Sequence, residues 1–146
     1  MEISRRTDYA IRLISALALN GDSPLSVREA AEKNDVPYAF ARSIQHDLVQ
    51  SGIVKAVRGS QGGMLLAIDP SDLTLCRLIE IMQGPINVAT CTSDPDWCKR
   101  QKGCPFHPVW LNLEVMIRNY LCSINIKQLM VGEEIRLPSK LSFFCQ

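Results

Sequence analysis

Three cysteines follow one another closely in the second half of the chain and could hold a metal ion or an inorganic cluster. Cys91, Cys98 and Cys104 are separated by six and five residues, so a polar loop could turn their thiolates toward one centre. Structural zinc and cluster iron both favour a fourth protein ligand, and His107 follows Cys104 by three positions. The spacing therefore predicts a zinc or iron-sulfur site, with thiols in a metal-free loop as the alternative.

The other three cysteines, Cys76, Cys122 and Cys145, have no partner at a useful spacing. We interpret the first two as small buried apolar residues and Cys145 as an exposed thiol in a C-terminal tail. The sequence contains no secretory signal and no apolar run long enough to cross a membrane. We therefore expect a cytoplasmic protein whose clustered cysteines bind a metal and do not build a disulfide framework.

Composition indicates one folded globular unit with no membrane partner. The chain has 146 residues, of which 47% are hydrophobic and 21% charged, and this balance excludes a wholly disordered protein. The net charge of +1 does not by itself indicate a nucleic-acid partner. However, the segment from Leu48 to Ile68 carries Lys55 and Arg58 and no acidic residue, which leaves a small positive patch.

Three short helices are predicted to precede a hairpin. The helices run from Thr7 to Leu19, from the cap Ser26 to about Lys33, and from Pro37 to Ser51-Gly52. The spacing of Ser26 and Glu29 predicts a reciprocal capping box. The hairpin strands are residues 53–57 and 64–68, joined by a glycine-rich loop that needs positive φ angles.

This order of elements is typical of a winged helix-turn-helix domain, in which the third helix enters the major groove of DNA. Arg42, Ser43 and His46 lie on the outward face of that helix and are predicted to contact bases. On the hairpin, Arg58 could enter a narrow minor groove, and Ser60 and Gln61 lie beside it. Solvated polar faces with no ligand are the alternative for all of these residues.

The remaining chain is predicted to supply a connection, the cysteine loop and a dimerisation helix. A helix from Leu73 to Met82 has Thr74 as its cap, and a long helix begins at Pro108 with one unpartnered apolar stripe. Such a stripe favours packing against a second copy of the chain. We divide the chain into a DNA-binding domain (1–70), a connecting helix (71–85), a cluster-binding loop (86–107), a dimerisation helix with a short following helix (108–130) and a tail (131–146).

Several stretches in this order resemble the Rrf2 family of winged-helix regulators, which includes IscR, NsrR and RirA. They are residues 7–12, 57–63 and 73–85 and the cysteine loop followed by Val109-Trp110, and the resemblance covers about residues 1–130. It implies a homodimer that binds promoter DNA at an inverted repeat, with the state of an iron-sulfur cluster changing the affinity. Relatives of the IscR and NsrR kind have five residues between the first two cysteines where this chain has six, so both 2Fe-2S and 4Fe-4S remain open.

The resemblance leaves two candidates for the fourth ligand. His107 matches the position that IscR-like proteins use for a 2Fe-2S cluster, whereas Asp8 resembles the carboxylate that NsrR-like proteins supply from the partner subunit to a 4Fe-4S cluster. Without a ligand role, Asp8 would be an exposed acid that favours the helix dipole, and His107 would cap the helix at Pro108.

We therefore expect a mostly helical protein with a small β-hairpin: a transcription regulator whose DNA affinity depends on a cluster sensing redox state, nitric oxide, or iron or cluster supply. No catalytic triad or paired carboxylates are discernible, so we do not expect an enzyme. The alternatives are a small iron-sulfur or zinc protein with an electron-transfer or structural role, and a regulator without a cluster.

Overall fold

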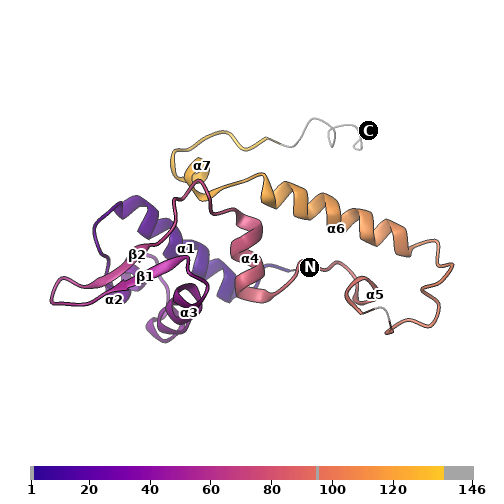
Figure 1. The fold of residues 1–146 in the computed structure, drawn as a ribbon, viewed down its shortest axis with the longest axis horizontal. Helices are drawn as coiled ribbons and strands as arrows, with labels where there is room; N and C mark the ends of the chain where they lie inside the picture. The colour runs from indigo at the N-terminus through magenta and orange to yellow at the C-terminus, as the bar shows by residue number, and fades with distance from the viewer. Residues whose placement is uncertain (1, 95, 137–146) are drawn as a thin grey trace.

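The computed structural model describes residues 2–94 and 96–136 and confirms a mostly helical fold with a small β-hairpin (Figure 1). Its helices are α1 (Arg5–Asn20), α2 (Val27–Lys33), α3 (Tyr38–Gln50), α4 (Leu75–Gln83), α5 (Thr90–Ser93), α6 (His107–Cys122) and α7 (Ile126–Met130). The antiparallel strands are β1 (Val54–Val57) and β2 (Gly63–Leu66), with Val54 opposite Leu66. The predicted exposed thiol of Cys145 lies outside the described residues.

Helix α1 forms the centre of the winged-helix unit. The Ser4 side chain caps it by accepting a hydrogen bond from the Thr7 amide at 3.1 Å, and the helix begins at Arg5, two residues before the predicted start at Thr7. Apolar residues at helical spacing then face the core and are buried: Ala10, Leu13, Ile14 and Leu17. Thr7 is also fully buried, and its hydroxyl donates to Gln83 Oε1 at 2.6 Å. The start of α1 is therefore fixed to the end of α4.

Helices α2 and α3 and the hairpin complete the same core. Ala30, Ile44 and Leu48 are buried, as are Ile53 and Met64 of the hairpin region. The β2 strand also pairs with the loop before α2, because the Leu25 and Met64 amides donate to each other's carbonyl at 3.0 and 2.8 Å. These contacts make one continuous apolar core for the first three helices and the wing.

The caps of α2 and α3 differ from the prediction. Ser26 caps α2, but the Glu29 carboxylate pairs with Lys33 at 2.7 Å and does not close the reciprocal half of a capping box. Pro37, predicted as the first helical residue of α3, is its N-cap, and the helix begins one position later at Tyr38.

In the wing loop, only Gly59 has a positive φ. Gly62 and Gly63 are required for another reason, since a Cβ would lie 2.4 Å from the Val57 oxygen or 2.5 Å from the Leu25 oxygen.

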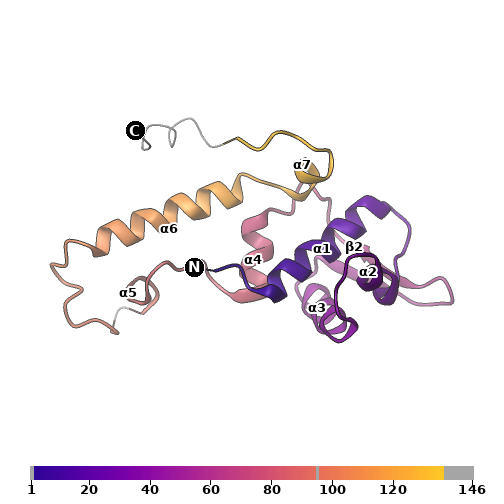
Figure 2. The same cartoon turned by 180° about the vertical axis from the view of Figure 1, so that it is seen from behind.

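Helices α4 and α6 connect the winged-helix unit to a projecting arm (Figures 1 and 2). They pack through a small apolar cluster of Cys76, Ile79, Ile86, Ile117 and Leu121. Beyond it, α6 extends away from the hairpin, and none of the described residues between 87 and 123 is buried. Within the described part of the chain, every helix is too short or too polar to span a bilayer.

Candidate metal centre and nucleic-acid interface

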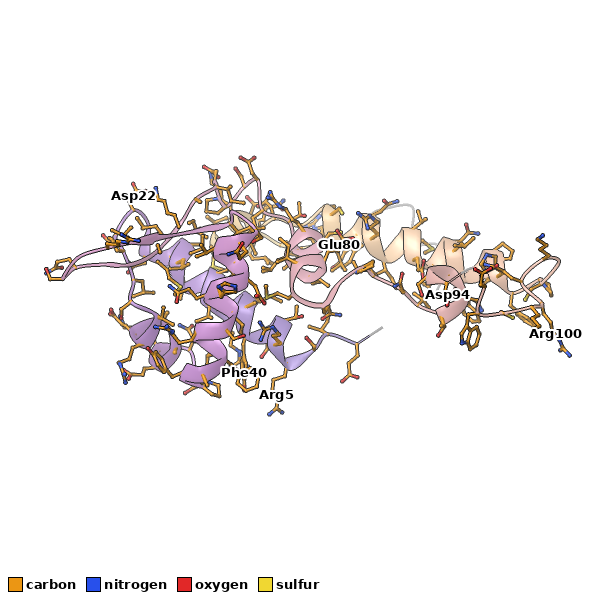
Figure 3. The ribbon with its side chains drawn as sticks, turned by 60° about the horizontal axis from the view of Figure 1, so that its bottom comes forward. Arg5, Asp22, Phe40, Glu80, Asp94 and Arg100 are labelled. Carbon is orange, nitrogen blue, oxygen red and sulfur yellow. The ribbon has the colours of Figure 1, made fainter. Side chains whose placement is uncertain are left out.

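The three cysteines predicted to bind a metal occupy the far end of the projecting arm. Cys91 lies in α5, a single helical turn that the sequence did not predict, and Cys98 and Cys104 lie in the turns that follow. All three are free thiols with intermediate exposure. Figure 3 shows this end through the labelled Asp94 and Arg100, on the opposite side of the molecule from Asp22 in the winged-helix unit.

Gln101 contacts every candidate ligand residue of this loop. Its amide donates to the Cys98 carbonyl at 3.0 Å, and its own carbonyl accepts from the Cys104 amide at 3.2 Å. Its side-chain Nε2 donates to the Cys91 carbonyl at 2.8 Å and lies 3.2 Å from His107 Nε2. Sequence reasoning did not identify Gln101, which therefore emerges from the structure as the residue that organises the loop.

Glu114 attaches the loop to α6. Its Oε1 accepts from the Val88 amide at 2.7 Å and from the Thr92 hydroxyl, on the two sides of the α5 start. Glu114 is also missing from the sequence-based candidates, although it is the one acidic residue within α6. The Cys91 turn is thus held by a carboxylate from a helix that begins 16 residues later in the chain.

His107 does not cap α6, contrary to one interpretation of the sequence. It is the first helical residue, and the preceding Phe106 occupies the N-cap position without a side-chain bond. His107 Nδ1 is buried and has no hydrogen-bond partner among the described residues. Because a buried polar nitrogen without a partner costs free energy, this atom is chemically suited to a metal ligand role.

Asp8 is engaged within its own helix. It lies in the first turn of α1, where a carboxylate favours the helix dipole, and pairs with Arg12 Nη2 at 2.8 Å. Both side chains are nearly half exposed, so this ion pair holds Asp8 weakly.

Within residues 2–94 and 96–136, no three His, Cys, Asp or Glu side chains are gathered around one point as a metal site. The three thiols and the His107 nitrogen have the chemistry for zinc or cluster iron, and they would have to draw together on binding.

The outward face of α3 is open to solvent, as expected for a major-groove reader. Arg42, Ser43 and His46 are all exposed there. Arg6 from α1 reaches the same face, donating through Nη2 to Ser43 Oγ at 3.0 Å and to Asp47 Oδ2 at 2.5 Å. Asp47 is thereby neutralised beside a face that would meet phosphates. No local pattern in the sequence indicates this bond between two helices.

The wing presents a second exposed set of polar residues. Arg58, Ser60 and Gln61 are exposed in the loop between β1 and β2, and Lys55 is exposed on β1. No Asp or Glu occurs from Leu48 to Ile68, so the hairpin carries only positive charge. Together, the hairpin and α3 offer cations at two places on the winged-helix unit.

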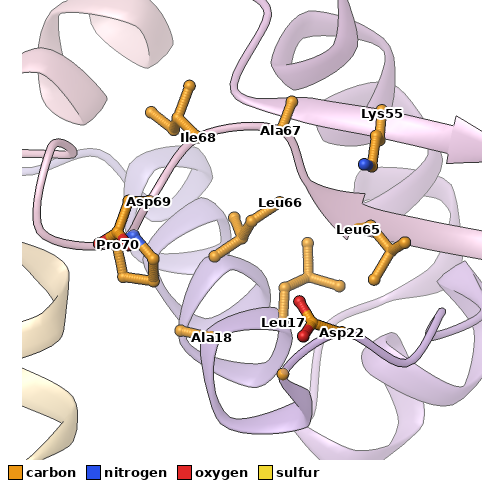
Figure 4. Close-up of a pocket in the computed structure, with 11 residues that line it drawn as sticks. Leu17, Ala18, Asp22, Lys55, Leu65, Leu66, Ala67, Ile68, Asp69 and Pro70 are labelled. Atoms are coloured by element: carbon orange, nitrogen blue, oxygen red, sulfur yellow. The ribbon is translucent and has the colours of Figure 1, made fainter.

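A pocket of about 300 Å³ lies between the end of α1 and β2 (Figure 4). Its lining is mostly aliphatic, with Asp22, Lys55 and Asp69 as its charged members. Asp69 accepts from the Ser71 hydroxyl and amide, and these bonds lower the pKa of its carboxyl. The pocket contains none of the predicted site residues.

Comparison with known proteins gives consistent matches over nearly the whole chain. The sequence model of the Rrf2 family, described as iron-dependent transcriptional regulators, matches residues 3–132. A protein of Aquifex aeolicus assigned as an HTH-type transcriptional regulator is 30% identical, with 94% of this chain and 96% of that protein covered.

Two solved structures share the fold. CymR of B. subtilis, described as its global cysteine regulator, has a TM-score of 0.75 at 22% identity, covering 92% of this chain and 99% of CymR. T. potens IscR has a TM-score of 0.72 at 22% identity, covering 100% of this chain and 93% of IscR. These similarities confirm the predicted winged-helix architecture.

Proposed function

Because this chain belongs to the Rrf2 family, it is a transcriptional regulator and not an enzyme, and we propose that an iron-sulfur cluster in the cysteine loop controls its affinity for promoter DNA. The observation that carries the proposal is the donor set around Gln101: three free thiols and a buried imidazole nitrogen without a partner. The electron-carrier alternative is set aside, because the relatives are regulators of transcription.

In this proposal Cys91, Cys98 and Cys104 bind the cluster as thiolates. His107 Nδ1 or Asp8 of the partner subunit supplies the fourth ligand, which corresponds to a 2Fe-2S or a 4Fe-4S cluster respectively. When bound, the cluster supplies a redox-active group that oxidants, nitric oxide or iron supply can alter. Gln101 and Glu114 orient the loop, in the way that outer residues usually orient metal ligands.

The winged-helix unit binds the DNA. Arg42, Ser43 and His46 on α3 read base edges in the major groove, while Arg58, Ser60 and Gln61 of the wing contact the minor groove or phosphates. Exposed apolar residues of α6, among them Val109, Trp110 and Met116, form the homodimer contact. A two-fold dimer of this kind requires an inverted-repeat site.

Polar contacts link the loop to the DNA-reading helix one element at a time. Glu114 attaches the loop to α6, and Arg118 of α6 pairs with Glu80 of α4. At the end of α4, Gln83 holds Thr7 of α1. Through Arg6, α1 then holds Ser43 and Asp47 on α3. We infer that ordering of the loop by a cluster changes the position of α3 through these contacts.

A regulator without a cluster is the second candidate. CymR, which shares the fold, is described as a cysteine regulator, so proteins of this architecture respond to different signals. Structural zinc in the loop would fit the same donors and would make the site structural and not sensory.

Analysis of the metal in anaerobically purified protein separates these candidates. We expect a coloured protein that contains iron and sulfide, and replacing any one of Cys91, Cys98 and Cys104 with Ala should remove the colour. Cys145→Ala is the matched control and should keep it. Stoichiometric zinc without iron would contradict the proposal, as would colourless wild-type protein.

The fourth ligand can be assigned in the same way. The Ala variant of the true ligand, either His107→Ala or Asp8→Ala, should give a cluster with an altered spectrum and lower stability in oxygen, because one iron becomes open to solvent. If both variants match the wild type, neither residue is a ligand.

A further inference from the structure

Two cysteines outside the candidate metal centre meet where α4 and α6 join. Cys76, on the first turn of α4, is buried, whereas Cys122, the last residue of α6, is exposed. The exposure of Cys122 contradicts the interpretation of both residues as buried apolar positions. The Cys122 thiol lies near enough to help raise the pKa of the Cys76 thiol, although 46 positions separate the two residues in the sequence.

Backbone pairing brings these two residues together. The Leu75 amide donates to the Ile124 carbonyl at 3.0 Å, and the Ile126 amide donates to the Leu73 carbonyl at 2.9 Å. Thr74 and Asn125 are opposite each other in an antiparallel bridge. This pairing fixes the start of α4 beside the end of α6, as Figure 1 shows.

A second contact one helical turn away confirms that these faces meet. Glu80 lies four positions after Cys76 on α4, and Arg118 lies four positions before Cys122 on α6. Residues four apart share a helix face, and Glu80 forms an ion pair with Arg118. Figure 3 labels Glu80 at this junction. The two helices therefore meet at both a pair of thiols and an ion pair.

We propose that Cys76 and Cys122 form a redox-active dithiol that a peroxide closes into an intrachain disulfide. The exposed Cys122 thiolate attacks hydrogen peroxide, the O–O bond breaks, and Cys122 becomes a sulfenic acid, while the released hydroxide takes up the proton that the Cys122 thiol had lost and leaves as one water. Cys76 sulfur then attacks Cys122 sulfur, the S–O bond breaks, and the hydroxyl leaves as a second water with the Cys76 proton. The two thiols together lose two electrons and the peroxide gains them.

The environment of the pair sets the order of these steps. Burial raises the pKa of the Cys76 thiol to about 12, and the nearby Cys122 thiol acts in the same direction. Cys76 therefore remains protonated at neutral pH and is shielded from direct attack, so Cys122 reacts first. The resulting bond would fix α4 of the winged-helix unit to α6 of the arm, whether or not the cysteine loop holds a cluster.

Peptide mapping of the full-length protein tests this proposal. The metal-free protein is treated with hydrogen peroxide, its remaining thiols are alkylated, and it is digested with trypsin. Cleavage after Arg and Lys places Cys76 in peptide 59–77, Cys122 in 119–127, Cys91 and Cys98 together in 78–99, and Cys104 in 103–118. A link between Cys76 and Cys122 therefore has a mass that no other cysteine pairing gives.

We expect peptides 59–77 and 119–127 to be linked, with equal loss of the two free thiols, and we expect dithiothreitol to restore both. Cys122→Ser should abolish the link, and because this side chain is exposed the variant keeps the fold. Ser123→Ala, at the neighbouring exposed position, is the matched control and should retain the link. A link between two copies of 119–127, a link from Cys76 to any other cysteine, or full alkylation of Cys122 after peroxide would overturn the proposal.

Discussion

The winged-helix unit and the cysteine-bearing arm are stabilised in different ways. The unit has a continuous core that includes the fully buried Leu13, Ile44 and Leu48. In contrast, none of the described residues from 87 to 123 is buried, and the loop of the arm is organised mainly by bonds to Gln101 and Glu114. The winged-helix unit thus has an apolar core of its own. Binding of a metal and packing against a second subunit would therefore stabilise the arm more than the unit.

Removing a core side chain should have the largest effect and should separate the two regions most clearly. Leu13→Ala leaves a cavity in the winged-helix core and should lower the free energy of unfolding by about 2 to 5 kcal/mol. In metal-free protein, Cys98→Ala should change it by less than about 0.5 kcal/mol, because Cys98 touches no buried core. Urea unfolding measures both values, and equal losses in the two variants would contradict the comparison.

DNA binding should depend on the winged-helix unit alone for its direct contacts. Arg42→Ala should cost about 1 to 3 kcal/mol on a cognate site with little effect on random DNA, because α3 is the element that we propose to read base edges. Arg58→Ala should weaken cognate and random duplexes more evenly and reduce the salt dependence, since we propose that the wing contacts phosphates or the minor groove.

Fluorescence anisotropy at several salt concentrations measures these effects on DNA affinity. Lys99→Ala, which removes an exposed cation from the arm, is the control and should leave affinity unchanged. Arginine variants that are indistinguishable from the wild type would refute this division of roles.

In the arm, Gln101 should matter more than its neighbours for metal binding. Gln101→Ala removes the side-chain bonds to Cys91 and His107 and should lower metal affinity by about 10- to 100-fold. Lys102→Ala changes the next residue, which is exposed, and should have no effect. Competition with a coloured chelator measures the affinity, and equal affinities of the two variants would show that Gln101 does not position the ligands.

The smallest expected effects come from removing one side-chain hydroxyl in each of the two regions. Thr7→Val removes a buried bond to Gln83 and should cost about 1 kcal/mol, because Gln83 Oε1 still accepts from the Ser4 amide. Ser93→Ala removes an exposed bond to the Thr90 carbonyl in the arm and should cost nothing measurable. Thermal unfolding measures the loss of stability in each variant. A greater loss in Ser93→Ala than in Thr7→Val would contradict the comparison.

Local patterns in the sequence predicted the elements well. Thr74 caps α4 as expected, and the spacing of apolar residues located α1, α3 and the long helix α6. The contacts that organise the site were not predictable in this way. Arg6 and Ser43 are 37 positions apart, and Cys76 and Cys122 are 46 apart, whereas periodicity reports only neighbours on one element. Gln101 lies in a turn without periodicity, so nothing local distinguished it from Lys102.

We propose that cluster binding in the arm changes the DNA affinity of the winged-helix unit. The most direct test of this proposal is anaerobic footprinting and affinity measurement on the DNA upstream of the protein's own coding sequence, with cluster-loaded protein, chelator-stripped protein and Cys98→Ala. We predict a protected inverted repeat, an affinity change of about 5- to 150-fold on stripping, and a Cys98→Ala variant that behaves like stripped protein in both preparations. Equal affinity of loaded and stripped protein, or no protected inverted repeat in either state, would contradict the claim.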